Sequence, residues 1–303
     1  MHRPIVTALA VFFSLFTARA STTITLVSPP NASPGMAGGT QFTLSGNTAV
    51  FATGNDGVNA LAFDALGNLY EADFGGKIFK ITPQGVATQF SSSAATGINN
   101  PTGLAFDVDG SLYVSGSGSS TGLVVKVAAN GASSTGIYSS DNYIANGVAL
   151  DLAGNVYVSS FGAIYKVASG GGTSTFATGT TGYGLATTAD GFLYEARQFD
   201  GSIKKYALDG SSSSVFAVGL TQPSDVAVDA AGKVYYYDSM ERVSYLVGAG
   251  SANLTDIIRP DVSTNPTYHL ALFSATPEPS RASLALLGLA AGVFRRRRPG
   301  SKR

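Results

Sequence analysis

The chain has 303 residues, with 19 Lys and Arg against 19 Asp and Glu, and it contains no cysteine. The lack of cysteine excludes disulfides, thiolate nucleophiles and Cys-ligated zinc, so an apolar core must hold the fold together. Nine of the basic residues lie in the two ends, which leaves 10 bases against 18 acids in residues 21–275. This acidic balance argues against a nucleic-acid partner, because phosphates require basic contacts.

The N-terminus has the pattern of a cleavable secretory signal. Arg3 is followed by an apolar run over residues 5–16 and by the small residues of Ala18-Arg19-Ala20. The run is shorter than the roughly 20 residues that a membrane-spanning helix needs. We therefore expect residues 1–20 to be a signal peptide that is removed before Ser21, and the mature protein to be exported.

Five segments of the chain repeat one pattern with a period of about 41 residues. They read NALAFDALGNLYEAD from Asn59, TGLAFDVDGSLYVSG from Thr102, NGVALDLAGNVYVSS from Asn146, YGLATTADGFLYEAR from Tyr183 and SDVAVDAAGKVYYYD from Ser224. The period is typical of a four-stranded propeller blade. Each segment reads as a first strand, a tight turn and a second strand that opens with a tyrosine, and two further strands follow.

The turn between the first two strands explains most of the carboxylates. An aspartate there accepts local backbone hydrogen bonds, and a glycine tolerates positive φ. We expect structural roles for the turn aspartates, with the hydroxyl of Thr188 standing in for the aspartate in the fourth segment: Asp64, Asp107, Asp151, Asp190 and Asp229. The repeats resemble NHL-type propeller repeats over most of residues 48–250, which implies a β-propeller.

Five repeats leave enough chain for one more blade. Strand-like segments begin at Thr23, Gln41 and Thr48 near one end and at Tyr268 near the other. Pairing the chain ends in one sheet removes exposed strand edges. We therefore expect residues 21–275 to form an all-β, six-bladed β-propeller whose last blade is closed by N- and C-terminal strands.

Two repeat positions vary in identity and carry polar side chains. One is the start of the first strand, and the other follows the second-strand tyrosine. If both face one mouth of the channel, their oxygens converge there, and such a ring suits Ca²⁺. The candidate channel-mouth residues are Asn59, Glu71, Asn146, Glu195 and Asp225.

This layout distantly resembles the gluconolactonase-like propellers, and the matching residues are Asn146 and Asp225. The resemblance implies a Ca²⁺-dependent lactonase or related hydrolase as one alternative, although the N-terminal strands lack the glutamate motif of that family. A lyase-type propeller is a second alternative, and it would use His269, the one histidine of residues 21–275. A solvated channel with polar lining and no catalytic group stays open beside both. Tyrosines that break the pattern, Tyr183 and Tyr235-Tyr236-Tyr237, are candidates for stacking on a sugar.

The C-terminus has three parts in order. Pro277-Glu278-Pro279 precedes an apolar run over residues 282–294, and a basic block of Arg295, Arg296, Arg297 and Arg298 follows. Positive charge resists translocation, so the block stays on the cytoplasmic side. Residues 276–303 resemble the PEP-CTERM sorting tail. The resemblance implies transient anchoring by a short membrane helix and cleavage by an exosortase-type protease. It also implies that the source is a Gram-negative bacterium that makes exopolysaccharide. A plain C-terminal anchor is the alternative.

These observations favour an exported propeller of the cell surface or extracellular matrix. We expect a non-enzymatic binding or structural module, with a polysaccharide or an envelope protein as its partner.

Overall fold

The computed structural model describes residues 22–27, 39–43, 58–82, 86–141, 145–180, 182–228, 232–238, 242–246, 254–258 and 270–274. These residues form 23 strands and one short helix, α1 (Ser93–Thr96). The prediction of an all-β fold is therefore confirmed, and α1 is a single helical turn between two strands.

Each of five consecutive stretches of chain forms a four-stranded antiparallel sheet, which we call a blade. Blade 1 consists of β3 (Val58–Phe63), β4 (Leu69–Asp73), β5 (Ile78–Ile81) and β6 (Ala87–Ser91). Blade 2 consists of β7 (Asn100–Phe106), β8 (Leu112–Ser117), β9 (Thr121–Val127) and β10 (Ser134–Asp141). Blade 3 consists of β11 (Gly147–Leu150), β12 (Val156–Ser160), β13 (Gly162–Val167) and β14 (Thr173–Thr180). Blade 4 consists of β15 (Gly182–Thr187), β16 (Phe192–Arg197), β17 (Ser202–Ala207) and β18 (Ser213–Val218). Blade 5 consists of β19 (Asp225–Val228), β20 (Val234–Asp238), β21 (Arg242–Leu246) and β22 (Leu254–Ile258).

A further sheet joins segments from the two ends of residues 22–274. It has the order β2-β1-β23, with β1 (Thr22–Val27), β2 (Gly39–Thr43) and β23 (Leu270–Ser274). β1 and β2 are antiparallel, and Thr25 lies opposite Gln41. The strand expected from Thr48 lies outside the described residues.

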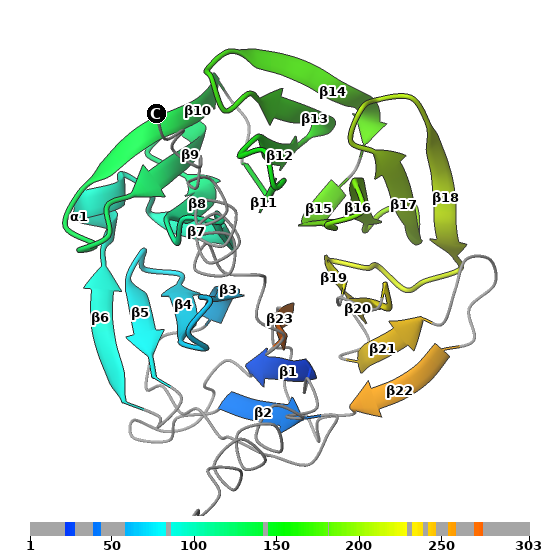
Figure 1. The fold of residues 1–303 in the computed structure, drawn as a ribbon, viewed down its shortest axis with the longest axis horizontal. Helices are drawn as coiled ribbons and strands as arrows, with labels where there is room; N and C mark the ends of the chain where they lie inside the picture. Colours follow the sequence, from blue (N-terminus) through cyan, green and yellow to red (C-terminus); the bar gives the residue numbers. More distant parts are fainter. Residues whose placement is uncertain are drawn as a thin grey trace, which may run out of the picture. The chain divides into compact units, whose positions relative to one another are not determined.

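The first strands of successive blades contact one another, so the blades follow each other around a common centre (Figure 1). β7 contacts β3 and β11, and β15 contacts β11 and β19. In each blade the second, third and fourth strands succeed one another outward from the first. This is the arrangement of an all-β propeller.

The repeated turn aspartates have the structural role expected from the sequence. The Asp64 Oδ1 accepts hydrogen bonds from the backbone N–H groups of Leu66 and Asn68, each at 2.9 Å. Asp107 and Asp151 make the same pair of bonds in blades 2 and 3. In blade 4 the Thr188 Oγ1 accepts one bond, from the N–H of Phe192 at 3.2 Å. Asp229 lies outside the described residues.

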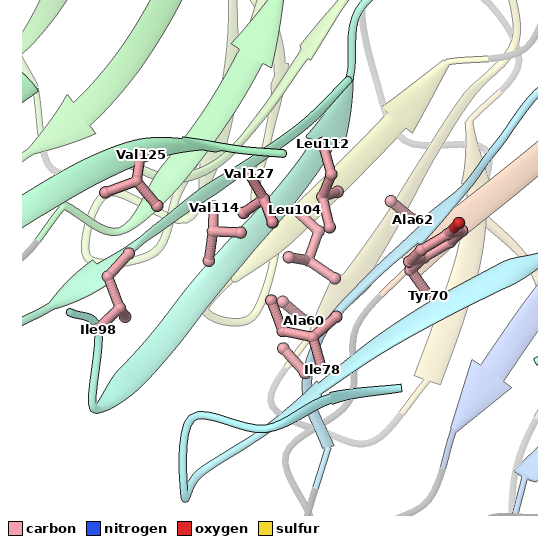
Figure 2. Packing of buried hydrophobic residues seen from close by; sticks show 11 residues of the cluster. Ala60, Ala62, Tyr70, Ile78, Ile98, Leu104, Leu112, Val114, Val125 and Val127 are labelled. Atoms are coloured by element: carbon pink, nitrogen blue, oxygen red, sulfur yellow. The ribbon is translucent and has the colours of Figure 1, made fainter. Parts of the chain in front are cut away.

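Most of the buried apolar surface lies between neighbouring blades. In Figure 2, Tyr70 and Ile78 of blade 1 face Leu104 and Val114 of blade 2. The Tyr70 ring makes edge contacts with Phe90 at 5.1 Å and with Phe106 at 4.8 Å between centroids. The tyrosines that open the second strands are buried, as the repeat predicts.

A lysine that sequence reasoning missed accompanies these tyrosines. Its ammonium lies over the ring of the second-strand tyrosine in four blades, at 5.2–5.5 Å from the centroid. The four are Lys80, Lys126, Lys166 and Lys205. Lys126 also pairs with the turn carboxylate of Asp107 at 3.1 Å. A lysine at one position of the third strand in four repeats is visible in the sequence and could have predicted this packing.

Candidate functional site

The first strands of the five blades surround a narrow pocket of about 70 Å³ where these strands begin. Glycines line much of it and allow close approach. A Cβ on Gly147 would collide with the Tyr183 carbonyl, and a Cβ on Gly184 would collide with the Asp225 carboxylate. The polar side chains among the lining residues belong to Thr102 and Asp225. Of the five predicted residues, Asp225 is the one that lines this pocket, which we call the channel mouth.

The two predicted asparagines bind the neighbouring blade. The Asn59 amide donates to Pro101 O and, at 2.9 Å, to Asn100 Oδ1, both in blade 2. The Asn146 amide donates to Gly182 O of blade 4, at 3.5 Å. Thr102, at the equivalent position of blade 2, donates from Oγ1 to Ala145 O at 2.6 Å. These polar side chains therefore link successive blades by hydrogen bonds.

The two predicted glutamates are buried within the sheets. Neighbouring residues of a strand point to opposite faces. The tyrosines Tyr70 and Tyr194 pack toward the following blade, so Glu71 and Glu195 face the other way. Both glutamate side chains are buried, and Glu71 lies opposite Leu61 and Phe79 in its sheet. Neither glutamate lines the channel mouth.

Glu195 belongs to a polar cluster between blades 3 and 4. Its Oε2 accepts a hydrogen bond from the Tyr206 hydroxyl at 2.5 Å and lies 3.9 Å from the Arg197 Nε. Its Oε1 has no hydrogen-bond partner among the described residues. Burial raises the pKa of the Glu195 carboxyl, although the Tyr206 hydroxyl and the positive charges of Arg197 and Lys204 lower it. Burial, followed by the bond to Glu195, also raises the pKa of the Tyr206 hydroxyl.

The fit to a calcium ion can be judged from these placements. In the part of the chain that the structure describes, no three His, Cys, Asp or Glu side chains lie close enough to share a metal ion. The Asn59 amide is engaged with blade 2, and the Glu195 carboxylate is engaged with Tyr206. The predicted oxygen ring is therefore not assembled by the described residues, and Asp225 with Thr102 is what faces the mouth.

His269, the signal peptide and the tail residues Pro277, Glu278, Pro279 and Arg295 to Arg298 lie outside the described residues. Within the described ranges, no helix is long and apolar enough to cross a membrane.

Exposed aromatic side chains gather at the end of the propeller that carries the channel mouth. Phe74, Phe161 and Phe199 are 46%, 69% and 66% exposed. Each lies in the turn between the second and third strands of its blade. This turn adjoins the start of the first strand, because Val58 pairs with Asp73 and Gly147 with Ser159. The three side chains therefore lie at the same end as the channel mouth, and we call this the aromatic end.

Of the tyrosines proposed for sugar stacking, Tyr183 belongs to this end. It is half-buried on β15, and its ring lies 6.1 Å from that of Phe199. Tyr235 and Tyr236 are buried in the sheets instead. The phenylalanines were missed by sequence reasoning. Their signal is a Phe followed by Gly, or by Asp-Gly, just after the second strand in three repeats.

The opposite end of the blades is different. Its turns between first and second strands carry exposed aliphatic side chains, Leu66, Val108 and Leu152. A second pocket, of about 250 Å³, is lined by the far halves of the same first strands, including Phe63 and Phe106. Each end of the blades therefore exposes three large apolar side chains, which are aromatic at one end and aliphatic at the other.

The sequence matches no family model, and no curated protein matches it. Solved structures do match its fold. A structure of a nidogen/laminin complex is 14% identical with a TM-score of 0.67, covering 84% of this chain and 99% of that one. Virginiamycin B lyase from Staphylococcus aureus is 13% identical with a TM-score of 0.58, over 80% and 91%. A gluconolactonase from Xanthomonas campestris is 17% identical with a TM-score of 0.54, over 66% and 74%.

At these identities the likeness shows the fold alone. The neighbours include a lyase, a gluconolactonase and a nidogen/laminin complex, and one fold serves all three. This chain is a β-propeller, and its function must be argued from its own residues.

Proposed function

We propose that the chain is an exported, non-enzymatic binding module whose aromatic end binds a polysaccharide. The observation that carries the proposal is the placement of Phe74, Phe161 and Phe199. Three blades present an exposed phenylalanine at the same turn, and all three lie at the end that carries the channel mouth. Exposed aromatics that recur around one opening mark a binding surface rather than scattered surface residues.

The chemistry of this end fits an extended carbohydrate. Aromatic rings pack against the C–H faces of sugars, and a polymer can contact several blades at once. Polar groups lie at the same end: the Asp225 carboxylate at the channel mouth and the Arg197–Asp200 ion pair at 2.6 Å. The channel mouth itself, at about 70 Å³, is too small to enclose a sugar ring. The polymer would therefore lie across the mouth instead of entering it.

The wider architecture belongs to the same proposal. The chain would form six blades, with the sheet β2-β1-β23 as the blade that closes the ring. The pairing of β1 with β2 and the place of β23 beside β1 support this closure. Export through the signal peptide and sorting by the tail of residues 276–303 would deliver the propeller to the cell surface or matrix.

Affinity electrophoresis in gels that contain a soluble polysaccharide tests the binding function. The triple variant Phe74→Ser, Phe161→Ser, Phe199→Ser should lose its retardation. Burial of a Phe side chain is worth about 1.5–3 kcal/mol when complete, so partial burial of three rings gives a combined loss in affinity above about tenfold. The matched control is Leu66→Ser, Val108→Ser, Leu152→Ser at the other end, which should be retarded like the parent. Equal behaviour of the two variants in every polysaccharide tested would remove the proposal.

A Ca²⁺-dependent hydrolase of the gluconolactonase type is the second candidate. It is favoured by the carboxylate of Asp225 at the channel mouth and by the shared fold. Binding of an ion to the folded state alone raises stability by mass action. A rise in melting temperature at millimolar Ca²⁺ that Asp225→Ala abolishes would support this candidate, and a flat response would exclude it. The lyase alternative depends on His269, which lies outside the described residues.

A further inference from the structure

Blade 4 departs from blades 2 and 3 on the face that it turns toward blade 3, whereas blade 1 has Glu71 opposite Phe79 at the position of Glu195 and Lys204. The internal repeat provides the comparison, because equivalent residues are identified by their register. Two cross-strand pairs on this face show the difference. The first pair is Val114–Val125 in blade 2, Val158–Tyr165 in blade 3 and the charged pair Glu195–Lys204 in blade 4. The second pair is Leu112–Val127 in blade 2, Val156–Val167 in blade 3 and Leu193–Tyr206 in blade 4.

This charged face is costly unless it has a use. Glu195 is fully buried, and a buried carboxylate costs free energy that its partners must offset. Tyr206 holds one of its oxygens, and the other has no partner among the described residues. The hydroxyl of Thr180, the last residue of β14, is likewise buried without a hydrogen bond in the described part of the chain. In blades 2 and 3, apolar and aromatic residues pack at these positions without a carboxylate.

A pocket of about 410 Å³ lies beside this face, between β14 of blade 3 and β17–β18 of blade 4. Its volume falls in the range of small-molecule sites. Phe176 and Tyr206 line it with rings 5.8 Å apart, and Lys204 lines it with its ammonium 4.9 Å from the Tyr206 centroid. The rest of the lining includes the hydroxyls of Ser211, Ser212 and Ser213.

We propose that this inter-blade pocket binds a sugar acid. Lys204 supplies a cation for a carboxylate, the serine hydroxyls match the hydroxyls of the ligand, and the Phe176 ring packs against one face of the sugar. The bond from Tyr206 to Glu195 holds the aromatic wall in place. A free sugar acid and a uronate residue of a polysaccharide present the same chemistry.

The pocket between blades 1 and 2 serves as an internal comparison. It has about 350 Å³ and lies against Phe90, the counterpart of Phe176. Its lining residues include no charged side chain. The position of Lys204 is taken there by Val125, which is buried. Both pairs of blades therefore have a pocket, and the Lys204 ammonium is what distinguishes the proposed site.

The inference does not rest on the proposed function. The pocket adjoins the turn between the third and fourth strands, at the end of β17 away from Phe199. Substitutions at the aromatic end should leave this pocket intact, so one proposal can fail while the other stands.

Titration calorimetry of the mature chain with sodium glucuronate, tri-galacturonate and glucose tests the site. Glucuronate should bind at least tenfold more tightly than glucose, and Lys204→Ala should abolish this preference. Lys205→Ala is the matched control, because it removes the same charge from the opposite face of β17, where Lys205 lies over Phe192. It should keep the preference.

Two further measurements keep the test decisive. Lys204→Arg should retain binding if the charge is what matters, and chemical-shift changes on adding glucuronate should map to residues 210–213. A tri-galacturonate affinity at least tenfold above that of glucuronate would identify a polymer residue as the ligand, and equal affinities a free sugar acid. No binding of either acid at 10 mM, or equal losses in the Lys204 and Lys205 variants, would overturn the proposal.

Discussion

Thr102 and Asn59 show that a polar side chain at the start of a first strand can be structural. Each donates a hydrogen bond to a backbone carbonyl of the next blade, Ala145 O and Pro101 O. Such a bond gives a buried backbone acceptor a donor from the neighbouring blade. The sequence suggested that Asn59 supplies an oxygen ligand to Ca²⁺. Its hydrogen bonds show instead that it links two neighbouring blades, as Thr102 does.

Removal of one link should destabilise the fold. Thr102→Val keeps the shape of the side chain but leaves Ala145 O without its 2.6 Å hydrogen bond. The expected loss in free energy of unfolding is about 1–2 kcal/mol. Urea denaturation measures it, with Thr88→Val as control, because the exposed Thr88 Oγ1 is 3.4 Å from its acceptor. If Thr88→Val lowers the free energy of unfolding as much as Thr102→Val does, the inter-blade hydrogen bond contributes no more to stability than the exposed one.

Glu195 should make stability depend on pH. Its folded-state pKa is raised from 4.5, chiefly by burial. As pH rises from 4.5, the unfolded chain loses this proton before the folded chain does, so the folded state loses stability. Glu195→Gln removes this contribution. The melting temperature of the parent should therefore fall relative to that of Glu195→Gln as the pH rises above 4.5.

Asp190→Asn controls for the loss of one negative charge, because Asp190 lies in an exposed turn. If the melting temperature of the parent instead rises relative to that of Glu195→Gln as the pH rises, burial does not dominate the pKa of this carboxyl.

At the scale of the strand, the repeat predicts much of the architecture. The turn Asp and Gly, the second-strand tyrosine and the 41-residue period are local signals, and the structure follows them in the described blades. The site prediction was less accurate for the glutamates because it did not use the alternation of side chains between the two faces of a strand. Glu195 follows Tyr194, so the two must face opposite sides of the sheet, and neither side is the channel mouth.

The exposed phenylalanines were harder to predict for a different reason. A Phe in a short turn looks the same in sequence whether it is buried or exposed. Exposure depends on the neighbouring blade, and blade 2 has no aromatic residue in the equivalent turn. Phe90, in contrast, sits in a fourth strand and packs on Tyr70.

At the scale of the whole molecule, the sheet β2-β1-β23 brings distant parts of the chain together. Deletion of residues 23–51 would remove nearly all of β1 and β2 and leave β23 without the strand beside it. The melting temperature should fall far more than when an equally long surface segment is replaced by a shorter linker. An unchanged melting temperature would show that the stability of the fold does not depend on these strands and would contradict the proposed closure.

The C-terminal tail should decide where the molecule ends up. Replacement of Pro277, Glu278 and Pro279 by alanine should block processing and keep the chain in the inner membrane, held by residues 282–294 and the arginine block. Cell fractionation with an antibody to the propeller measures this. Normal release of the variant would leave a simple anchor as the better account of the tail.

The central claim is that the aromatic end, and not the aliphatic end, meets the polymer. Hydrogen–deuterium exchange of the mature chain with and without a retarding polysaccharide tests it most directly, because it locates the contact without any substitution. The account predicts slower exchange in the turns that hold Phe74, Phe161 and Phe199, and no change in the turns that hold Leu66, Val108 and Leu152. Protection confined to the aliphatic turns, or spread equally over both ends, would contradict it.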